Sequence, residues 1–155
     1  MSNSYLSPAQ FHGYNWWVTT SEITRATLHE LLTRLSRFEP QRVAELFAET
    51  VDWEVAGDER VPWTGTRSGR DEVAAYFDTL WSVCDTAAAE NTVSQVLVDG
   101  SDAVVLGVFA QTIRATGRRF STPVALHITV DADGLITRLR LYEDSHAVAR
   151  AYADS

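Results

Sequence analysis

Residues 131–144 read DADGLITRLRLYED. The first four residues have the composition of a hairpin turn, and the segment LITRLRLYE then alternates apolar and polar side chains with the period of a strand. In this register Leu139, Leu141 and Glu143 share one face. We therefore predict a strand over residues 135–143 that presents two leucines and one carboxylate to the interior.

Three similar runs precede this strand, at residues 92–98, 103–115 and 120–130. Asp99-Gly100 joins the first two runs and Thr116-Gly117-Arg118 joins the next two. Both connections have turn residues that suit a hairpin. The second half of the chain is therefore expected to form an antiparallel meander.

Two helices are expected in the first half of the chain. One begins near Thr20-Ser21-Glu22, where a hydroxyl side chain ahead of an acidic one can cap a helix. Pro40 suits the first turn of the next helix, since the N–H that proline lacks would be unpaired there. The apolar positions at helical spacing are Leu28, Leu31, Leu32 and Leu35 in the first helix, and Val43, Leu46 and Phe47 in the second.

The segment TVDWEV, residues 50–55, alternates as a half-buried strand with Trp53 and Val55 on one face. We expect the next segment, GDERVPWTGTRSG, to be a loop, and RDEVAAYFDTLWSVC to be a third helix with Ser68 as its cap. One side of that helix carries Val73, Phe77, Leu80, Trp81 and Cys84. A short terminal helix carries Val148, Ala151 and Tyr152.

These elements predict an α+β fold in which three N-terminal helices and a curved antiparallel sheet enclose an apolar pocket, with a short C-terminal helix. Two regions are expected: an N-terminal aromatic arm over residues 1–19 and a single domain over residues 20–155. The arm contains the stretch FHGYNWWV, residues 11–18, which has neither helical nor strand periodicity.

Composition narrows the classes of partner. The net charge of -8 and the pI near 4.9 disfavour nucleic acid and anionic membranes, because both carry negative charge. Cys84 is the only cysteine, so neither an intrachain disulfide nor a cysteine-based metal site can form. The chain has neither a signal-peptide pattern nor an apolar run long enough to span a bilayer. We expect a cytoplasmic protein with no membrane partner.

The order of these elements, together with FAETVDWEV, GRDEVAAYF, DADGLITRL and LYED, resembles the SnoaL-like branch of the nuclear-transport-factor-type superfamily, which includes ketosteroid isomerases. The resemblance covers about residues 22–152. It implies a cone-shaped α+β barrel with a deep apolar pocket, often dimeric, with no required metal or cofactor. The fold hosts isomerases, hydrolases, cyclases, dehydratases and binding proteins, so it does not define the reaction.

The catalytic residues of two related groups of enzymes have no counterparts at the matching positions of this sequence. In ketosteroid isomerase-like members, the base, the tyrosine donor and its acidic partner would fall on Val55, Leu31 and Leu126. In epoxide hydrolase-like members, the Asp/Arg/Asp set would fall on Phe109, Gly107 and Leu141. All six positions lack the polar groups that those reactions need.

Glu143 is the candidate catalytic residue, because it is the only ionisable group on a predicted pocket face. Apolar neighbours should raise the pKa of its carboxyl group, so that it can act as acid and base by turns. The competing interpretation is that the strand has ended by Glu143, which then lies at the rim or caps the last helix. No histidine and carboxylate cluster has the spacing of a metal site.

The predicted substrate-binding residues line the pocket or belong to the arm. They are Trp53, Val55, Phe109, Gln111, Thr122, Leu126, Leu141, Phe77, Trp81, Tyr14, Trp16 and Trp17. Gln111 and Thr122 either bind a polar ligand group or satisfy one another or the backbone. Tyr76 and Trp81 have the spacing of core residues, for which packing is the commoner role. The arm either packs on its own domain or dimer partner, or closes over the ligand.

Two functions remain open. One is a cyclase, isomerase or dehydratase acting on a hydrophobic polyketide or terpenoid-type intermediate, with Glu143 moving a proton. The other is a non-catalytic protein that binds or carries such a molecule. A protein-interaction module is a third, weaker interpretation, and it would need a large exposed apolar patch.

Overall fold

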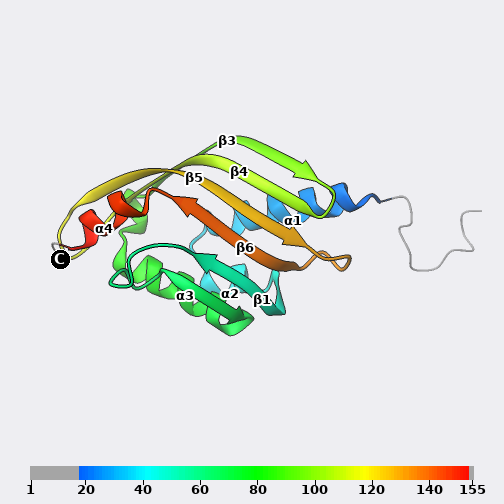
Figure 1. Cartoon of the computed structure of the whole chain (residues 1–155), viewed down its shortest axis with the longest axis horizontal. Helices are drawn as coiled ribbons and strands as arrows, with labels where there is room; N and C mark the ends of the chain where they lie inside the picture. Colours follow the sequence, from blue (N-terminus) through cyan, green and yellow to red (C-terminus); the bar gives the residue numbers. More distant parts are fainter. Residues whose placement is uncertain (1–17, 154–155) are drawn as a thin grey trace, which may run out of the picture.

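The computed structural model describes residues 18–153. The helices are α1 (Thr20–Leu35), α2 (Pro40–Ala44), α3 (Arg70–Val83), η2 (Thr86–Ala88, a 3₁₀ turn) and α4 (Ser145–Ala153). The strands are β1 (Phe47–Val55), β2 (Gly65–Gly69), β3 (Glu90–Asp99), β4 (Asp102–Thr112), β5 (Arg119–Val130) and β6 (Ile136–Glu143). They form one six-stranded sheet in the order β2-β1-β6-β5-β4-β3 (Figure 1).

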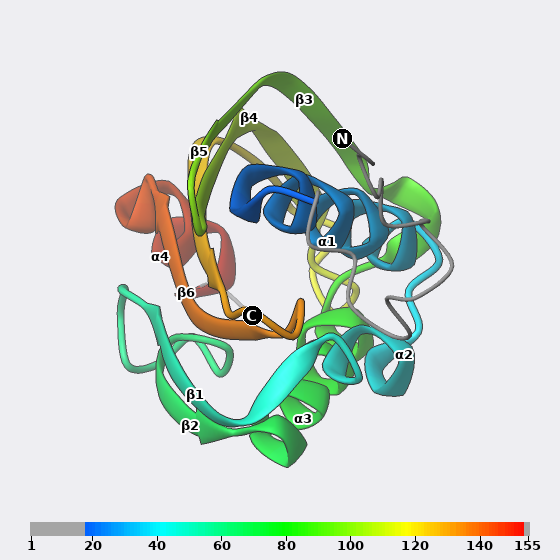
Figure 2. The same cartoon turned by 90° about the vertical axis from the view of Figure 1, so that its right-hand side faces the viewer.

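The predicted meander is confirmed, because β3, β4, β5 and β6 pair antiparallel with their neighbours in sequence. The sheet is mixed, however, since β1 pairs parallel with β6. A parallel pair needs a long connection, which β2, α3 and the first three strands of the meander provide here. Figure 2 shows the sheet curving as an open wall around α1, which confirms the expected α+β architecture.

Several local predictions were wrong. Residues 65–69, expected as loop, form the edge strand β2 on β1. Phe47 belongs to β1 and not to the second helix, which ends at Ala44. Ser68 does not cap α3: the N-cap is Gly69, and the Glu72 carboxylate accepts the backbone N–H groups of Ser68 and Gly69 at 2.7 and 2.9 Å. Cys84, expected on the third helix, lies just past the end of α3, and its backbone forms an isolated antiparallel β-bridge with Ile113.

Helix α1 is attached to the hairpin turns of the sheet through its hydroxyl side chains. Thr24 Oγ1 donates to the Gly100 carbonyl at 2.8 Å, and Thr27 Oγ1 donates to the Gly134 carbonyl at 2.9 Å. The helix begins with a capping box between Thr19 and Glu22, one residue earlier than the predicted cap. These bonds set the position of α1 along the inner face of the sheet.

The core lies between the inner face of the sheet and helices α1 and α3. Its fully buried side chains include Leu31, Phe47, Trp53, Val73 and Ile128. Along β5, alternate residues from Phe120 to Val130 are buried, as period-two alternation requires. Among the described residues, no helix is both long and apolar enough to cross a membrane.

Candidate functional site

A cavity of about 420 Å³ opens between the inner face of the sheet and helices α1 and α3. This volume lies in the range of small-molecule sites. Aromatic side chains make up much of its wall: Phe38, Trp53, Trp63, Tyr76, Phe77, Trp81, Phe109 and Phe120. The remaining wall is mostly aliphatic, so the cavity suits a hydrophobic molecule.

Glu143 is the last residue of β6, and its carboxyl group lines this cavity. The residue pairs with Val124 of β5, which places it on the inner face together with Leu139 and Leu141. Burial raises the pKa of the Glu143 carboxyl group to about 7, and the charge of the adjacent Asp144 adds to this effect. Within the described part of the chain, the carboxyl group has no hydrogen-bond partner.

Thr122 holds the backbone beside Glu143. Its Oγ1 accepts the Asp144 N–H at 2.7 Å and donates to the Pro123 carbonyl at 3.1 Å. Asp144 in turn accepts the Ala147 N–H at 3.0 Å, where α4 begins. Thr122 therefore satisfies the backbone and does not line the cavity, so its contribution is to fix the point at which β6 ends.

Gln111 lines the cavity at a second polar position. Its Nε2 donates to Asn91 Oδ1 at 3.1 Å, so part of its hydrogen-bonding capacity is satisfied by a side chain of β3. Gln111 pairs with Phe120, four residues along β5 from Val124, the partner of Glu143. The Gln111–Asn91 pair and the Glu143 carboxyl group therefore lie at different positions along β5 within the cavity.

Tyr76 is a polar cavity residue for which the sequence favoured a packing role over a role in the site. The residue is buried on α3 and lines the cavity. Burial raises the pKa of its hydroxyl group far above the ordinary range, and the Glu143 charge raises it further. No hydrogen bond holds this hydroxyl group among the residues described. A hydroxyl side chain on the apolar face of a helix was the signal that could have identified it.

The rings around Tyr76 hold one another in place. Trp53 packs edge-on against Tyr76 with 4.6 Å between ring centroids, and Phe77 stacks on Trp81 at 4.9 Å. The buried Trp53 Nε1 has no hydrogen-bond partner in the described structure. Packing of this kind restricts the rotamers of the wall and keeps the cavity preformed.

Most predicted substrate-binding residues lie in the cavity wall. Those in the wall are Trp53, Val55, Phe77, Trp81, Phe109, Gln111, Leu126 and Leu141. Thr122 is buried behind the wall, as described above. Tyr14, Trp16 and Trp17 fall outside the described residues, so the role of the arm stays a prediction.

Five of the six positions that align with catalytic residues of ketosteroid isomerase-like and epoxide hydrolase-like members lie in the cavity wall. Leu31, Val55 and Leu126 line the cavity, and so do Phe109 and Leu141. A Cβ atom on Gly107 would lie 2.0 Å from the Thr92 carbonyl oxygen, so this position has no room for the arginine that the epoxide hydrolase set requires. None of these six described positions therefore carries a polar side chain of either set.

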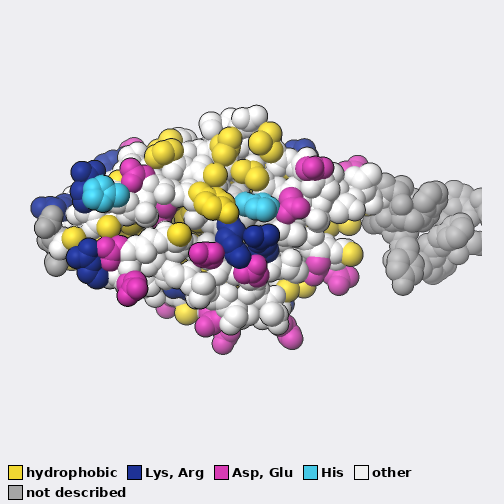
Figure 3. All heavy atoms as spheres, in the orientation of Figure 1, with side chains coloured by type: hydrophobic (Ala, Val, Ile, Leu, Met, Phe, Trp, Pro, Cys, Tyr) yellow, Lys and Arg dark blue, Asp and Glu magenta, His cyan; other side chains and the backbone are white. Residues whose placement is uncertain are grey.

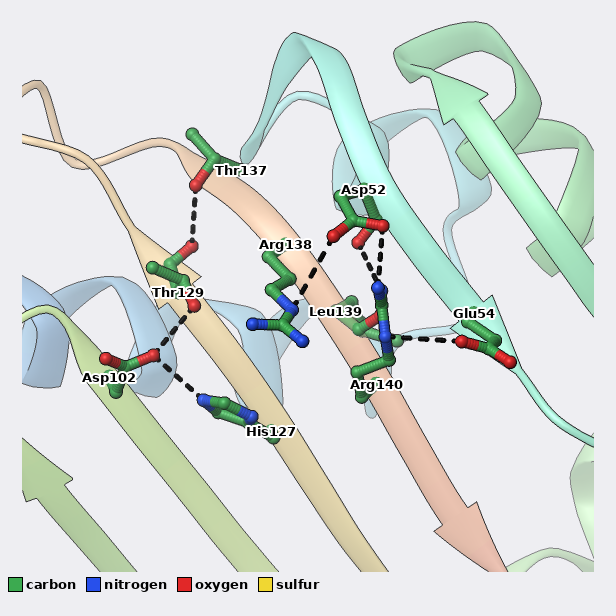
Figure 4. Close-up of polar contacts among 9 residues, drawn as sticks. All are labelled: Asp52, Glu54, Asp102, His127, Thr129, Thr137, Arg138, Leu139 and Arg140. Carbon is green, nitrogen blue, oxygen red and sulfur yellow. Dashed lines mark hydrogen bonds and ion pairs between the residues drawn. The ribbon is translucent and has the colours of Figure 1, made fainter.

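The opposite face of the sheet carries a separate polar network (Figures 3 and 4). Arg140 pairs with Asp52 at 2.7 Å, and His127 Nε2 lies 2.8 Å from Asp102 Oδ1, which also accepts Thr129 Oγ1 at 2.7 Å. Figure 3 shows apolar side chains gathered beside basic, acidic and histidine side chains on this face. No group of three potential metal ligands occurs among residues 18–153.

Several solved structures share this fold. An NTF2-like protein from Burkholderia thailandensis has 23% identity and a TM-score of 0.72, over 83% of this chain and 95% of its own. An NTF2-like protein of unknown function from Burkholderia pseudomallei has 21% identity and a TM-score of 0.74, over 84% and 97%. An LEH-like epoxide hydrolase from M. tuberculosis has 17% identity and a TM-score of 0.66, over 86% and 92%. At these identities the likeness shows the fold alone.

The comparison with curated proteins gives no match. The family model of the SnoaL-like domain matches residues 28–139, which is well over half of the chain. The matched region begins within α1, contains every element from α2 to β5, and ends within β6. This chain therefore belongs to the SnoaL-like family and has the NTF2-like fold.

Proposed function

We propose that this protein is a SnoaL-like enzyme, a cyclase, isomerase or dehydratase, that acts on a hydrophobic polyketide or terpenoid-type intermediate. The observation that carries the proposal is Glu143, the single charged side chain in the described wall of an otherwise largely apolar cavity. A carboxyl group with a pKa of about 7 is present in both protonation states near neutral pH. It can therefore accept a proton and return it.

In this scheme the wall and Glu143 have separate roles. The aromatic and aliphatic side chains fold a reactive substrate into one conformation and exclude water. The Glu143 carboxylate takes a proton from a substrate carbon, and the resulting acid delivers it to another substrate atom, so that no co-reactant is consumed. The Tyr76 hydroxyl group, which faces the same cavity, is available to hydrogen-bond a substrate oxygen.

The test begins with native mass spectrometry of freshly purified protein and identification of any small molecule that co-purifies. The identified molecule is then incubated with the wild type and with Glu143→Gln, which keeps the shape of the side chain and removes its acid–base chemistry. We expect a chemically changed product from the wild type and almost none from the variant. Full turnover by Glu143→Gln would refute the acid–base role.

The second candidate is a non-catalytic binding or carrier protein. It is favoured by the apolar side chains at Val55, Leu31 and Leu126, where ketosteroid isomerase-like members place their catalytic groups. A carrier would release its ligand chemically unchanged, and adding it to an extract that contains the pathway would leave the flux of that pathway unaltered. The same incubation therefore separates the two functions.

We further propose that the protein acts as a cytoplasmic homodimer. The cytoplasmic assignment is supported by the single cysteine, Cys84, because a chain with one cysteine has no intrachain disulfide that would need an oxidising compartment. The dimer is supported by apolar side chains exposed on the outer face of the sheet, of which Leu97, Val108 and Tyr142 are the largest.

A further inference from the structure

The cavity wall carries negative charge and nothing positive. Of its described residues, Glu143 is the only one with a formal charge, and neither arginine nor histidine lines the cavity. The carboxyl group accepts no hydrogen bond from another described side chain or backbone group. An ionised Glu143 therefore has no partner among residues 18–153.

The arginines of the neighbouring strands are held elsewhere. Arg67 of β2 lies over the Tyr76 ring, 5.0 Å from its centroid, and donates to the Thr64 carbonyl at 3.1 Å. Arg140 of β6 faces outward and binds Asp52 at 2.7 Å. Neither arginine belongs to the cavity wall, so the described residues offer Glu143 no counter-ion there.

The rest of the wall is suited to a positive charge. Three tryptophans, Trp53, Trp63 and Trp81, line the cavity together with five other aromatic residues. The faces of such rings attract cations, most strongly in tryptophan, and the attraction grows when the cation leaves water. The net charge of -8 also draws cations toward the protein and disfavours anions.

We propose that the cavity binds a hydrophobic molecule that carries a quaternary ammonium or protonated amine group, with the aromatic wall around that group and the Glu143 carboxylate as its counter-ion. The inference rests on the proposed function in one respect, that the ligand occupies this cavity, and it narrows the substrate class. It does not depend on turnover.

A neutral ligand and a cationic ligand place different demands on Glu143. Beside a neutral apolar molecule, an ionised carboxylate would be desolvated and unpaired, so the group stays protonated. Beside an ammonium group, the carboxylate gains an ion pair and the rings replace part of the lost hydration of the cation. The site therefore prefers the cation over an uncharged molecule of the same shape.

The preference is measurable with two probes of matched shape, phenyltrimethylammonium and its neutral carbon isostere tert-butylbenzene. Isothermal titration calorimetry, with tryptophan fluorescence as a second readout, gives both affinities for the full-length wild-type protein. We expect the cation to bind at least about tenfold more tightly than the isostere. A cation that binds no better than the isostere, or that does not bind, overturns the proposal.

Two Glu→Gln variants locate the effect. Glu143→Gln is expected to bring the two affinities close to parity. Glu49→Gln, an exposed residue of β1 outside the cavity wall, removes the same charge and should keep the wild-type preference. Unchanged cation binding by Glu143→Gln would overturn the role of Glu143 as counter-ion.

The ligand class and the enzyme proposal can fail separately. If the cation binds as expected but the co-purified ligand is never converted, the enzyme proposal fails and the ligand class stands. If the ligand is converted but the cation binds no better than its isostere, the ligand class fails and the enzyme proposal stands.

Discussion

Ionisation of the Glu143 carboxyl group destabilises the folded protein. The carboxyl pKa is near its ordinary value of 4.5 in the unfolded chain and about 7 in the folded protein, so the native state holds more protons between these values. Stability therefore falls as the pH rises from about 4.5 to about 7, and the full penalty remains above that range. Asp144, which adds to the shift, and Tyr76 are the titratable groups that interact with this carboxyl group.

We predict that Glu143→Gln is more stable than the wild type at about pH 8, by up to roughly 3 kcal/mol, and that the gap closes toward about pH 5. The glutamine avoids the penalty of burying a charge, while a protonated glutamic acid already avoids it at low pH. Urea denaturation at the two pH values measures the difference. Equal stability of both proteins at the higher pH would show that Glu143 is well solvated.

The Thr122 hydroxyl group gives a second residue-level prediction. Thr122→Val keeps the shape of this fully buried side chain but leaves the Asp144 N–H without its acceptor. We expect a loss of about 1–2 kcal/mol in the free energy of unfolding, since a buried backbone donor becomes unpaired. Thr122→Ser, which keeps the hydroxyl group, should lose less. If both variants lose equally, packing and not the hydrogen bond is responsible.

At the scale of elements, Gly107 controls how closely β3 approaches β4. The register of the β3–β4 pair shifts between Val93 and Gln95, beside Gly107. A Cβ atom at this position would meet the Thr92 backbone at 2.0 Å. Gly107→Ala should therefore push β3 outward and lower the free energy of unfolding by roughly 1–3 kcal/mol. Amide hydrogen exchange should rise in β3 and stay unchanged in β6; uniform exchange across both strands would contradict a local effect.

Sequence periodicity predicted the elements that have a regular period and missed those that do not. The leucines of α1 and the alternation in β5 and β6 were sufficient to identify these elements and to place Glu143 on the inner face. Residues 65–69, GTRSG, have no alternation, and they form a strand only because β1 offers an unpaired edge. Helical periodicity likewise placed Tyr76 on a buried face but could not show that a cavity lies beside its hydroxyl group.

At the scale of the whole molecule, the sheet has one face covered by helices and one face open (Figures 1 and 3). The open face exposes Leu97, Val108 and Tyr142 by 48%, 39% and 57%, together with the Arg140–Asp52 pair. Apolar side chains surrounded by charged and polar groups are typical of an association surface. We therefore expect two copies of the chain to pack through these outer faces, which would leave the cavity of each copy unobstructed.

Val108→Glu tests this association, because it places a charge at the apolar part of the open face. Size-exclusion chromatography with light scattering should give twice the chain mass for the wild type and a shift toward one chain mass for the variant. Val93→Glu is the matched control: Val93 is equally a surface valine, with 48% exposure, but it lines the cavity on the inner face. Because only the outer face is buried by association, the control should keep the dimer mass. A wild type that runs as a single chain at all concentrations, or a Val108→Glu variant that stays dimeric, would mean that this face remains open to solvent.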